Sequence, residues 1–139
     1  MCGLFSVFNF NNNVSFYERY VRDGLKYISN RGPDSSNVFT RDFFSIGHNR
    51  LRIQDLNRSA DQPFFSDCGE YAIIFNGEIY NHIELRNNLQ NKINFKTKSD
   101  TETLLYLLIH NGQAIINDLI GMFAFVFIDI RKKKIVFAR

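Results

Sequence analysis

The segment YAIIFNGEIYN, which runs from Tyr71 to Asn81, places an apolar run directly before an Asn-Gly pair and a helix start. The continuous apolar run from Tyr71 to Phe75 predicts a buried strand. Asn76-Gly77 after such a run is the leading signal for a type I′ hairpin. However, only three residues separate this pair from Asn81, which we expect to cap a helix, so a tight hairpin would have almost no second strand. The alternative is that the Asn76 side-chain N–H and the Gly77 backbone N–H form an oxyanion hole. The residues by themselves leave both interpretations open.

The patterns on either side of this segment predict an α+β fold. We expect strands over 2–8, 122–130 and 135–138, and a hairpin over 38–51 that turns near 41–42. Ser15 and Ser99 are each followed three residues later by glutamate, which is a capping box, so a helix should begin at each of them. The helix from Ser99 should end at Asn111-Gly112. Strands, helices and then strands follow one another without regular βαβ alternation, which indicates antiparallel sheets.

The composition is that of one ordinary domain, residues 1–139, with a net charge of +3. The basic cluster from Arg131 to Lys134 separates two apolar runs, so we interpret it as a hairpin turn and expect no nucleic-acid partner. We find no apolar run long enough to cross a membrane and no pattern of a secretion signal. Two cysteines make a poor disulfide framework, so we expect a reduced, cytoplasmic setting. The histidines lack metal-ligand spacing, so no metal site is predicted.

Cys2 is a candidate nucleophile because removal of Met1 would put a thiol and a free α-amine on one residue. The unperturbed pKa of the amine, about 7.7–8.0, suits a base near neutral pH, and terminal nucleophiles use their own amine in this way. Direct proton transfer from sulfur to nitrogen within one residue has a poor angle, so a bridging water is expected to carry the proton. The alternative is a chance cysteine ahead of a buried strand, and position alone does not decide between them.

Recognition of a zwitterionic amino acid needs one fixed cation and one fixed anion, and the chain offers a candidate for each. Arg50 ends an apolar strand and could fork onto an α-carboxylate. Asp100 could accept an α-ammonium. Each has an ordinary alternative: Arg50 as a surface arginine, and Asp100 as an acidic residue that the helix dipole favours in a first turn.

Taken together, these motifs resemble those of the class II glutamine amidotransferases, whose amidase domain has the N-terminal-nucleophile fold. The matching motifs run through the whole chain in order: Met1-Cys2-Gly3, Arg31-Gly32-Pro33-Asp34, Gly47-His48-Asn49-Arg50-Leu51, Gln62-Pro63, Asn76-Gly77-Glu78-Ile79-Tyr80-Asn81, Ser99-Asp100-Thr101-Glu102 and Gly121-Met122-Phe123-Ala124-Phe125. The R-G-P-D and N-G-E-I-Y-N versions resemble those of the asparagine synthetases.

The resemblance implies a four-layer αββα sandwich of antiparallel sheets and a role for each matching residue. Cys2 would be the nucleophile and its α-amine the base, with Asn76 and Gly77 as oxyanion donors. Glutamine would be bound by residues of three segments, namely Arg50, Leu51, Ile53, Gln54, Asn76, Gly77, Glu78 and Asp100. Arg52 and Gln54 stand where small and aliphatic residues are usual in the family, so we expect an altered pocket wall there.

The resemblance also implies a larger protein. The chain stops at Phe137-Ala138-Arg139, inside a predicted strand, so we expect the domain to be truncated at its C-terminus. In the family a synthetase domain follows, which adenylates aspartate with ATP and magnesium. We expect no cofactor in the present domain, because the chain has no glycine pair from which to build a phosphate loop.

The leading hypothesis is therefore an amidase that releases ammonia from glutamine for transfer to aspartate by the missing domain. Two alternatives stay open: the same amidase serving a sugar or peptide acceptor, and an inactive docking module that keeps only the fold. A homodimer is carried as a further hypothesis.

Overall fold

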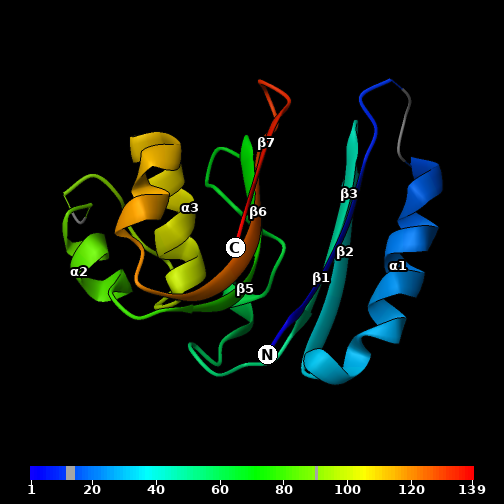
Figure 1. Ribbon diagram of the computed structural model, residues 1–139, viewed down its shortest axis with the longest axis horizontal. Coiled ribbons are helices and arrows are strands. Elements are labelled where there is room, and N and C mark those ends of the chain that lie inside the picture. Colours follow the sequence, from blue (N-terminus) through cyan, green and yellow to red (C-terminus); the bar gives the residue numbers. More distant parts are fainter. Residues whose placement is uncertain (12–14, 90) are drawn as a thin grey trace.

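A computed structural model describes residues 1–11, 15–89 and 91–139, and these form four layers (Figure 1). Helix α1, Glu18–Tyr27, covers the outer face of one sheet. Helices α2, His82–Asn87, and α3, Asp100–Asn111, cover the outer face of a second sheet. The two sheets face each other in the middle. The predicted α+β class and the αββα order of layers are confirmed.

The first sheet contains three antiparallel strands in the order β1-β3-β2. They are β1, Gly3–Phe8, β2, Ser35–Arg41, and β3, Phe44–Arg50. The central strand β3 is buried along its whole length and aligns Asn49 with Gly3 of β1. The turn between β2 and β3 contains Asp42 at a φ of 48°, which places the predicted hairpin turn where the sequence indicated.

The second sheet has the order β4-β5-β6-β7, and all of its pairs are antiparallel. Its strands are β4, Phe64–Phe65, β5, Tyr71–Ile79, β6, Gly121–Asp129, and β7, Lys134–Ala138. Strand β5 continues straight through Asn76 and Gly77, which pair with Ala124 and Phe123 of β6. The type I′ hairpin interpretation of this Asn-Gly pair is therefore wrong. Arg131, Lys132 and Lys133 of the basic cluster do lie in the turn between β6 and β7, with Lys133 at a φ of 50°, and Lys134 begins β7.

The three predicted helices form, but only one has a side-chain cap. Helix α1 follows a 3₁₀ turn, η1 (Ser15–Tyr17), and its N-cap is Tyr17, not Ser15, whose side chain lies outside the described part of the structure. Asn81 is the N-cap of α2, yet its side chain bonds to the backbone at Asp118 and Ile120 instead of capping the helix.

Helix α3 shows half of the predicted capping box. The Ser99 hydroxyl accepts a hydrogen bond from the Glu102 N–H at 3.3 Å. The Glu102 carboxylate binds the backbone N–H groups of Lys96 and Thr97, at 2.9 and 2.7 Å. The helix ends as predicted, at Asn111, and Gly112 follows with a φ of 68°. The remaining 3₁₀ turns are η2, Ser29–Arg31, η3, Arg58–Ala60, and η4, Gly112–Asp118.

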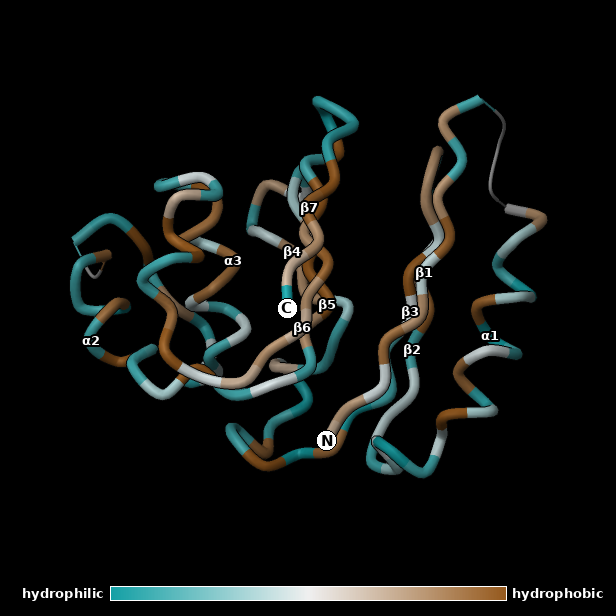
Figure 2. The backbone as a smooth tube through the Cα atoms, viewed as in Figure 1, coloured by the Kyte–Doolittle hydropathy of each residue, from teal (hydrophilic) through white to brown (hydrophobic). Residues whose placement is uncertain are grey.

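Side-chain alternation along the strands separates two apolar cores. Residues 72 and 74 of β5 face the first sheet and pack with Phe44 and Ile46 of β3. Residues 73 and 75 face the other way and pack with Leu104 and Leu105 of α3. Figure 2 shows the hydrophobic segments concentrated in the strands and in α3, and hydrophilic segments in the turns. None of the described helices is long and apolar enough to span a bilayer.

Candidate active site

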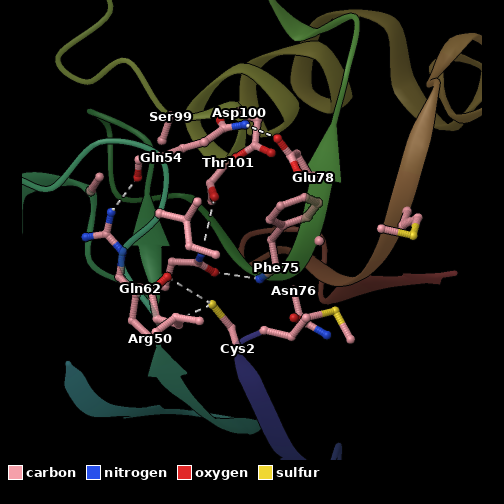
Figure 3. Close-up of a pocket in the computed structure, with 16 residues that line it drawn as sticks. Cys2, Arg50, Gln54, Gln62, Phe75, Asn76, Glu78, Ser99, Asp100 and Thr101 are labelled. Carbon is pink, nitrogen blue, oxygen red and sulfur yellow. Dashed lines mark hydrogen bonds between the residues drawn. The ribbon is translucent and has the colours of Figure 1, made fainter. Parts of the chain in front are cut away.

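A cavity of about 130 Å³ opens where β1 and β3 of the first sheet meet β5 of the second (Figure 3). Every residue that the sequence analysis placed in the site lines this cavity: Cys2, Arg50, Leu51, Ile53, Gln54, Asn76, Gly77, Glu78 and Asp100. Residues that are separated by up to 98 positions in the chain are thus brought to one place.

Cys2 directly precedes β1 and is partly buried at the floor of the cavity. Its Sγ accepts a hydrogen bond from the Leu51 N–H at 3.4 Å and lies 3.8 Å from the Leu51 carbonyl oxygen. The Arg31 Nε–H donates to the Cys2 carbonyl at 2.9 Å, so the R-G-P-D loop anchors the backbone of the cysteine.

Asn76 comes from the other sheet and shares the face of β5 that is turned toward the first sheet. This follows from strand alternation, because Ala72 and Ile74 pack in the core between the sheets. The Asn76 Oδ1 is buried and has no hydrogen-bond partner among the described residues. The amide oxygen of Asn76 is therefore not engaged with another described side chain or backbone group, and the residue lines the cavity wall.

Gly77 presents its backbone to the cavity because of how β5 is paired. The N–H groups of Phe75 and Ile79 both point to the edge of β5 away from β6, where they bind Gln62 and Asp100. Alternate residues of a strand direct their N–H groups to the same side, so the Gly77 N–H points to this edge as well. A Cβ at position 77 would lie 2.2 Å from the Met122 carbonyl oxygen, which explains why glycine is needed.

Arg50 lies in the cavity wall, but its guanidinium already forms hydrogen bonds with other groups of the protein. Nη1 donates to Asp61 at 2.5 Å and to the Asn57 carbonyl at 2.9 Å. Nη2 donates to the carbonyls of Gln54 and Asp55, at 3.2 and 2.5 Å. The Arg50 guanidinium, which we expected to bind an α-carboxylate, thus holds the loop 51–61 in this structure. The Arg50 side chain is only 5% exposed.

Asp61 is the partner that sequence reasoning missed. It pairs with Arg50 and also with Arg52, whose Nη2 lies 2.9 Å from its carboxylate. Partial burial acts to raise the pKa of Asp61, but the hydrogen bonds from Arg52 and Arg50 outweigh it and lower the pKa overall. No local pattern marks this aspartate, because its partners are set by the path of the loop.

Asp100 and Glu78 make the opposite end of the cavity anionic. Asp100 is buried at the start of α3, and its Oδ2 accepts from the Ile79 N–H at 3.1 Å. Burial raises the pKa of Asp100 to about 6, and the nearby Glu78 acts in the same direction. The Glu78 carboxylate accepts from Gln54 Nε2 at 3.2 Å (Figure 3). At neutral pH the pair can bind an ammonium group.

Gln62 and Thr101 also line the cavity, although the sequence analysis gave neither of them a role. The Gln62 side chain accepts from the Phe75 N–H at 2.6 Å and donates to the Thr101 hydroxyl at 3.2 Å (Figure 3). The Gln62-Pro63 motif was visible in the sequence. However, two adjacent residues do not predict which distant groups the Gln62 side chain will bind once it is buried. Among the described residues, no group of three or more acidic, histidine or cysteine side chains is placed to hold a metal ion.

Comparison with known proteins matches residues 1–139 to the family of glutamine amidotransferase domains. This chain belongs to that family. The amidotransferase domain is 40% identical to the probable asparagine synthetase [glutamine-hydrolyzing] of Schizosaccharomyces pombe over 139 residues, which are 100% of this chain and 25% of that protein. It is 34% identical to asparagine synthetase B [glutamine-hydrolyzing] of Escherichia coli, again over 100% of this chain and 25% of the relative.

Among solved structures, the amidotransferase domain is similar to the glutamine phosphoribosylpyrophosphate amidotransferase from B. subtilis. The TM-score is 0.54 with 26% identity, and the match covers 66% of this chain and 22% of that chain. The chain therefore spans about a quarter of the length of the relatives it matches. The family resemblance drawn from the motifs is confirmed, and so is the fold.

Proposed function

We propose that this domain hydrolyses the side-chain amide of glutamine to glutamate and ammonia, with the Cys2 thiolate as nucleophile. One observation carries the proposal: the Cys2 thiol from the first sheet and the Asn76 and Gly77 donors from the second line the same cavity. The family to which the chain belongs supports glutamine as the substrate.

The chemistry follows from the groups around the cavity. Once Met1 is removed, the α-amine of Cys2 takes the thiol proton through a water molecule. The thiolate attacks the side-chain carbonyl of glutamine, and the Asn76 amide and Gly77 N–H bind the oxyanion that forms. The carbon–nitrogen bond breaks, and the amine returns its proton to the leaving ammonia. Water, deprotonated by the same amine, then cleaves the thioester, which releases glutamate and restores the thiol.

The substrate's α-amino acid end would be held between opposite charges. Asp100 and Glu78 receive the α-ammonium, while Arg50 and the backbone of Leu51, Ile53 and Gln54 receive the α-carboxylate. Because both terminal nitrogens of Arg50 are engaged with the loop, binding of the carboxylate requires the exchange of at least one of these bonds or the use of the Nε–H. Recognition is then coupled to the position of the loop.

In a full-length protein the ammonia would pass to a synthetase domain that activates aspartate with ATP and magnesium. The relatives that support this are named asparagine synthetases, and the chain covers a quarter of their length. The present domain needs no cofactor for the hydrolysis. A sugar or peptide acceptor is the competing hypothesis, and the downstream sequence of the gene would discriminate between them. The cytoplasmic setting and the homodimer remain predictions.

The test is ammonia release from glutamine by protein whose first residue has been shown by mass analysis to be Cys2. We expect release by the parent chain and none above background by Cys2→Ala, with an unchanged circular dichroism spectrum. Ammonia from the Cys2→Ala variant would refute the assignment of the nucleophile. A folded, correctly processed parent chain that releases none would instead favour the inactive docking module.

A further inference from the structure

The backbone N–H and carbonyl of Phe75, at the edge of β5 that faces away from β6, are each bound by a side chain from another part of the fold. Its N–H donates to Gln62 Oε1 at 2.6 Å, and its carbonyl accepts from His48 Nε2 at 3.0 Å. Strand β4 pairs with β5 only as far as Ile73, so these two side chains take the place of a neighbouring strand at this point. The residue held in this way directly precedes Asn76.

His48 makes this bond from the opposite sheet. It lies on β3, where it pairs in register with Leu4 of β1, and it is fully buried. A carbonyl oxygen only accepts, so Nε2 carries the hydrogen and Nδ1 carries none. Nδ1 is buried without a partner among the described residues. A buried polar atom without a partner costs about 1–3 kcal/mol, so a histidine here is poorly explained by packing alone.

The charge state of His48 agrees with a donor role. Burial lowers the pKa of His48 to about 4, and the nearby Arg50 also lowers it, although the bond to Phe75 acts in the opposite direction. The ring is therefore neutral at neutral pH and donates a single fixed hydrogen. Since the bond crosses from the sheet beside the nucleophile to the sheet that carries the oxyanion donors, it relates the two halves of the site directly.

Gln62 binds the backbone N–H of the same residue, Phe75, from the loop side. Its Nε2 donates to the Thr101 hydroxyl at 3.2 Å, one residue after Asp100. Its backbone carbonyl accepts from Asn37 Nδ2 of β2 at 3.1 Å. Gln62 thus connects β5 with the start of α3 and with the first sheet, and its side chain is itself buried.

We propose that His48 and Gln62 are positioning residues that hold the Phe75 backbone, and through it the Asn76 and Gly77 donors, in register with the Cys2 thiol. We call this arrangement the Phe75 clamp. Much of the contact between the sheets is apolar packing, which is not directional and constrains the relative shift of the two sheets less sharply than hydrogen bonds do. Hydrogen bonds have defined distances and angles, and they fix this position. The inference rests on the proposed glutaminase function.

The clamp predicts a selective loss of transition-state stabilisation. The variants are His48→Leu and Gln62→Met, both of roughly conserved volume, and the matched control is Ile74→Val, a buried change on β5 that touches neither bond. Three quantities are measured per folded molecule: kcat, KM for glutamine, and the rate of alkylation of Cys2 by iodoacetamide. Alkylation needs the thiolate but no oxyanion hole. All variants carry Cys68→Ser, because Cys68 is an exposed thiol.

We expect kcat to fall about 10–100-fold in each clamp variant, because a displacement of about 1 Å costs on this order. KM and the alkylation rate should change less than threefold, and the Ile74→Val control should keep all three values. A clamp variant whose kcat equals that of the control overturns the inference, and so does a parallel loss of alkylation. If His48→Leu does not fold, Gln62→Met decides. A parent chain that releases no ammonia refutes the proposed function and the clamp together, whereas an active parent with unaffected variants refutes the clamp alone.

Discussion

The two walls of the cavity are built differently. One wall carries the reacting groups, Cys2, Asn76 and Gly77. Asn76 and Gly77 lie within a paired strand, and Cys2 directly precedes one. The wall around Arg50 is a loop whose carbonyl groups and Asp61 carboxylate accept hydrogen bonds from that one guanidinium. Strands fix the positions of groups within fractions of an ångström, whereas a loop adapts when its bonds are exchanged. Changes in the first wall should therefore act on kcat, and changes in the second on KM.

The largest effect is expected from the strand wall. Asn76→Ala removes one oxyanion donor and should lower kcat about 10²–10³-fold with little change in KM. Steady-state ammonia release at varied glutamine concentration measures both constants. The Asn76 side chain has no internal partner for its Oδ1, so the loss of stability should be small. A rate within a few-fold of the parent would show that Asn76 is not a donor.

The loop wall should respond in the opposite way. Arg50→Lys keeps the charge but has a single nitrogen, which cannot reach Asp61 and the Gln54 and Asp55 carbonyls at once. KM for glutamine should rise about tenfold, while kcat should stay within about threefold. The matched control is Arg52→Lys, because Arg52 also pairs with Asp61 but does not line the cavity. Equal changes in KM in the two variants would contradict the division between the walls.

A smaller effect should follow from pH. Burial raises the pKa of Asp100 to about 6, so the carboxylate is ionised at pH 7 and becomes protonated as the pH falls through 6. Because the neutral acid no longer attracts the α-ammonium, KM should rise several-fold between pH 7 and pH 5. In Asp100→Asn, KM should be high throughout and lose this inflection. A parent KM that is independent of pH over this range would exclude Asp100 from the binding of the ammonium.

The raised pKa of Asp100 should also affect stability, and here a lower pH should be favourable. A folded-state pKa above the unfolded value means that the folded chain binds the proton more tightly, so stability should increase as the pH falls from about 6 to about 4. At pH 7 the buried charge costs on the order of 1–3 kcal/mol. Asp100→Asn should therefore raise the free energy of unfolding in urea at pH 7, since an amide oxygen can still accept from Ile79. A less stable variant would contradict this account.

Local sequence patterns were sufficient for most of the elements and for the family. The apolar run of β5, the turns at Asp42 and at Arg131–Lys134, and the end of α3 at Asn111 all occur where the patterns indicated. Each of these signals depends on residues that are close in the chain, through periodicity, a positive φ or a helix stop. The ordered motifs also predicted nine of the residues that line the cavity.

Only the tertiary structure decided which partner each polar group has. Asn76-Gly77 is a turn signal by itself, and it forms a strand because β6 pairs with it along its length. Asn81 has a side chain typical of a helix cap, but both its amide nitrogen and its amide oxygen form hydrogen bonds with the backbone of the segment 118–120. The sequence indicated that the Arg50 guanidinium would be available to a ligand, but the fold places Asp61 against it. The Phe75 clamp likewise joins residues from three separate segments of the chain. Propensity acts over a few neighbouring residues, whereas a buried hydrogen bond is chosen among groups that only the folded chain brings within 3 Å or so of one another.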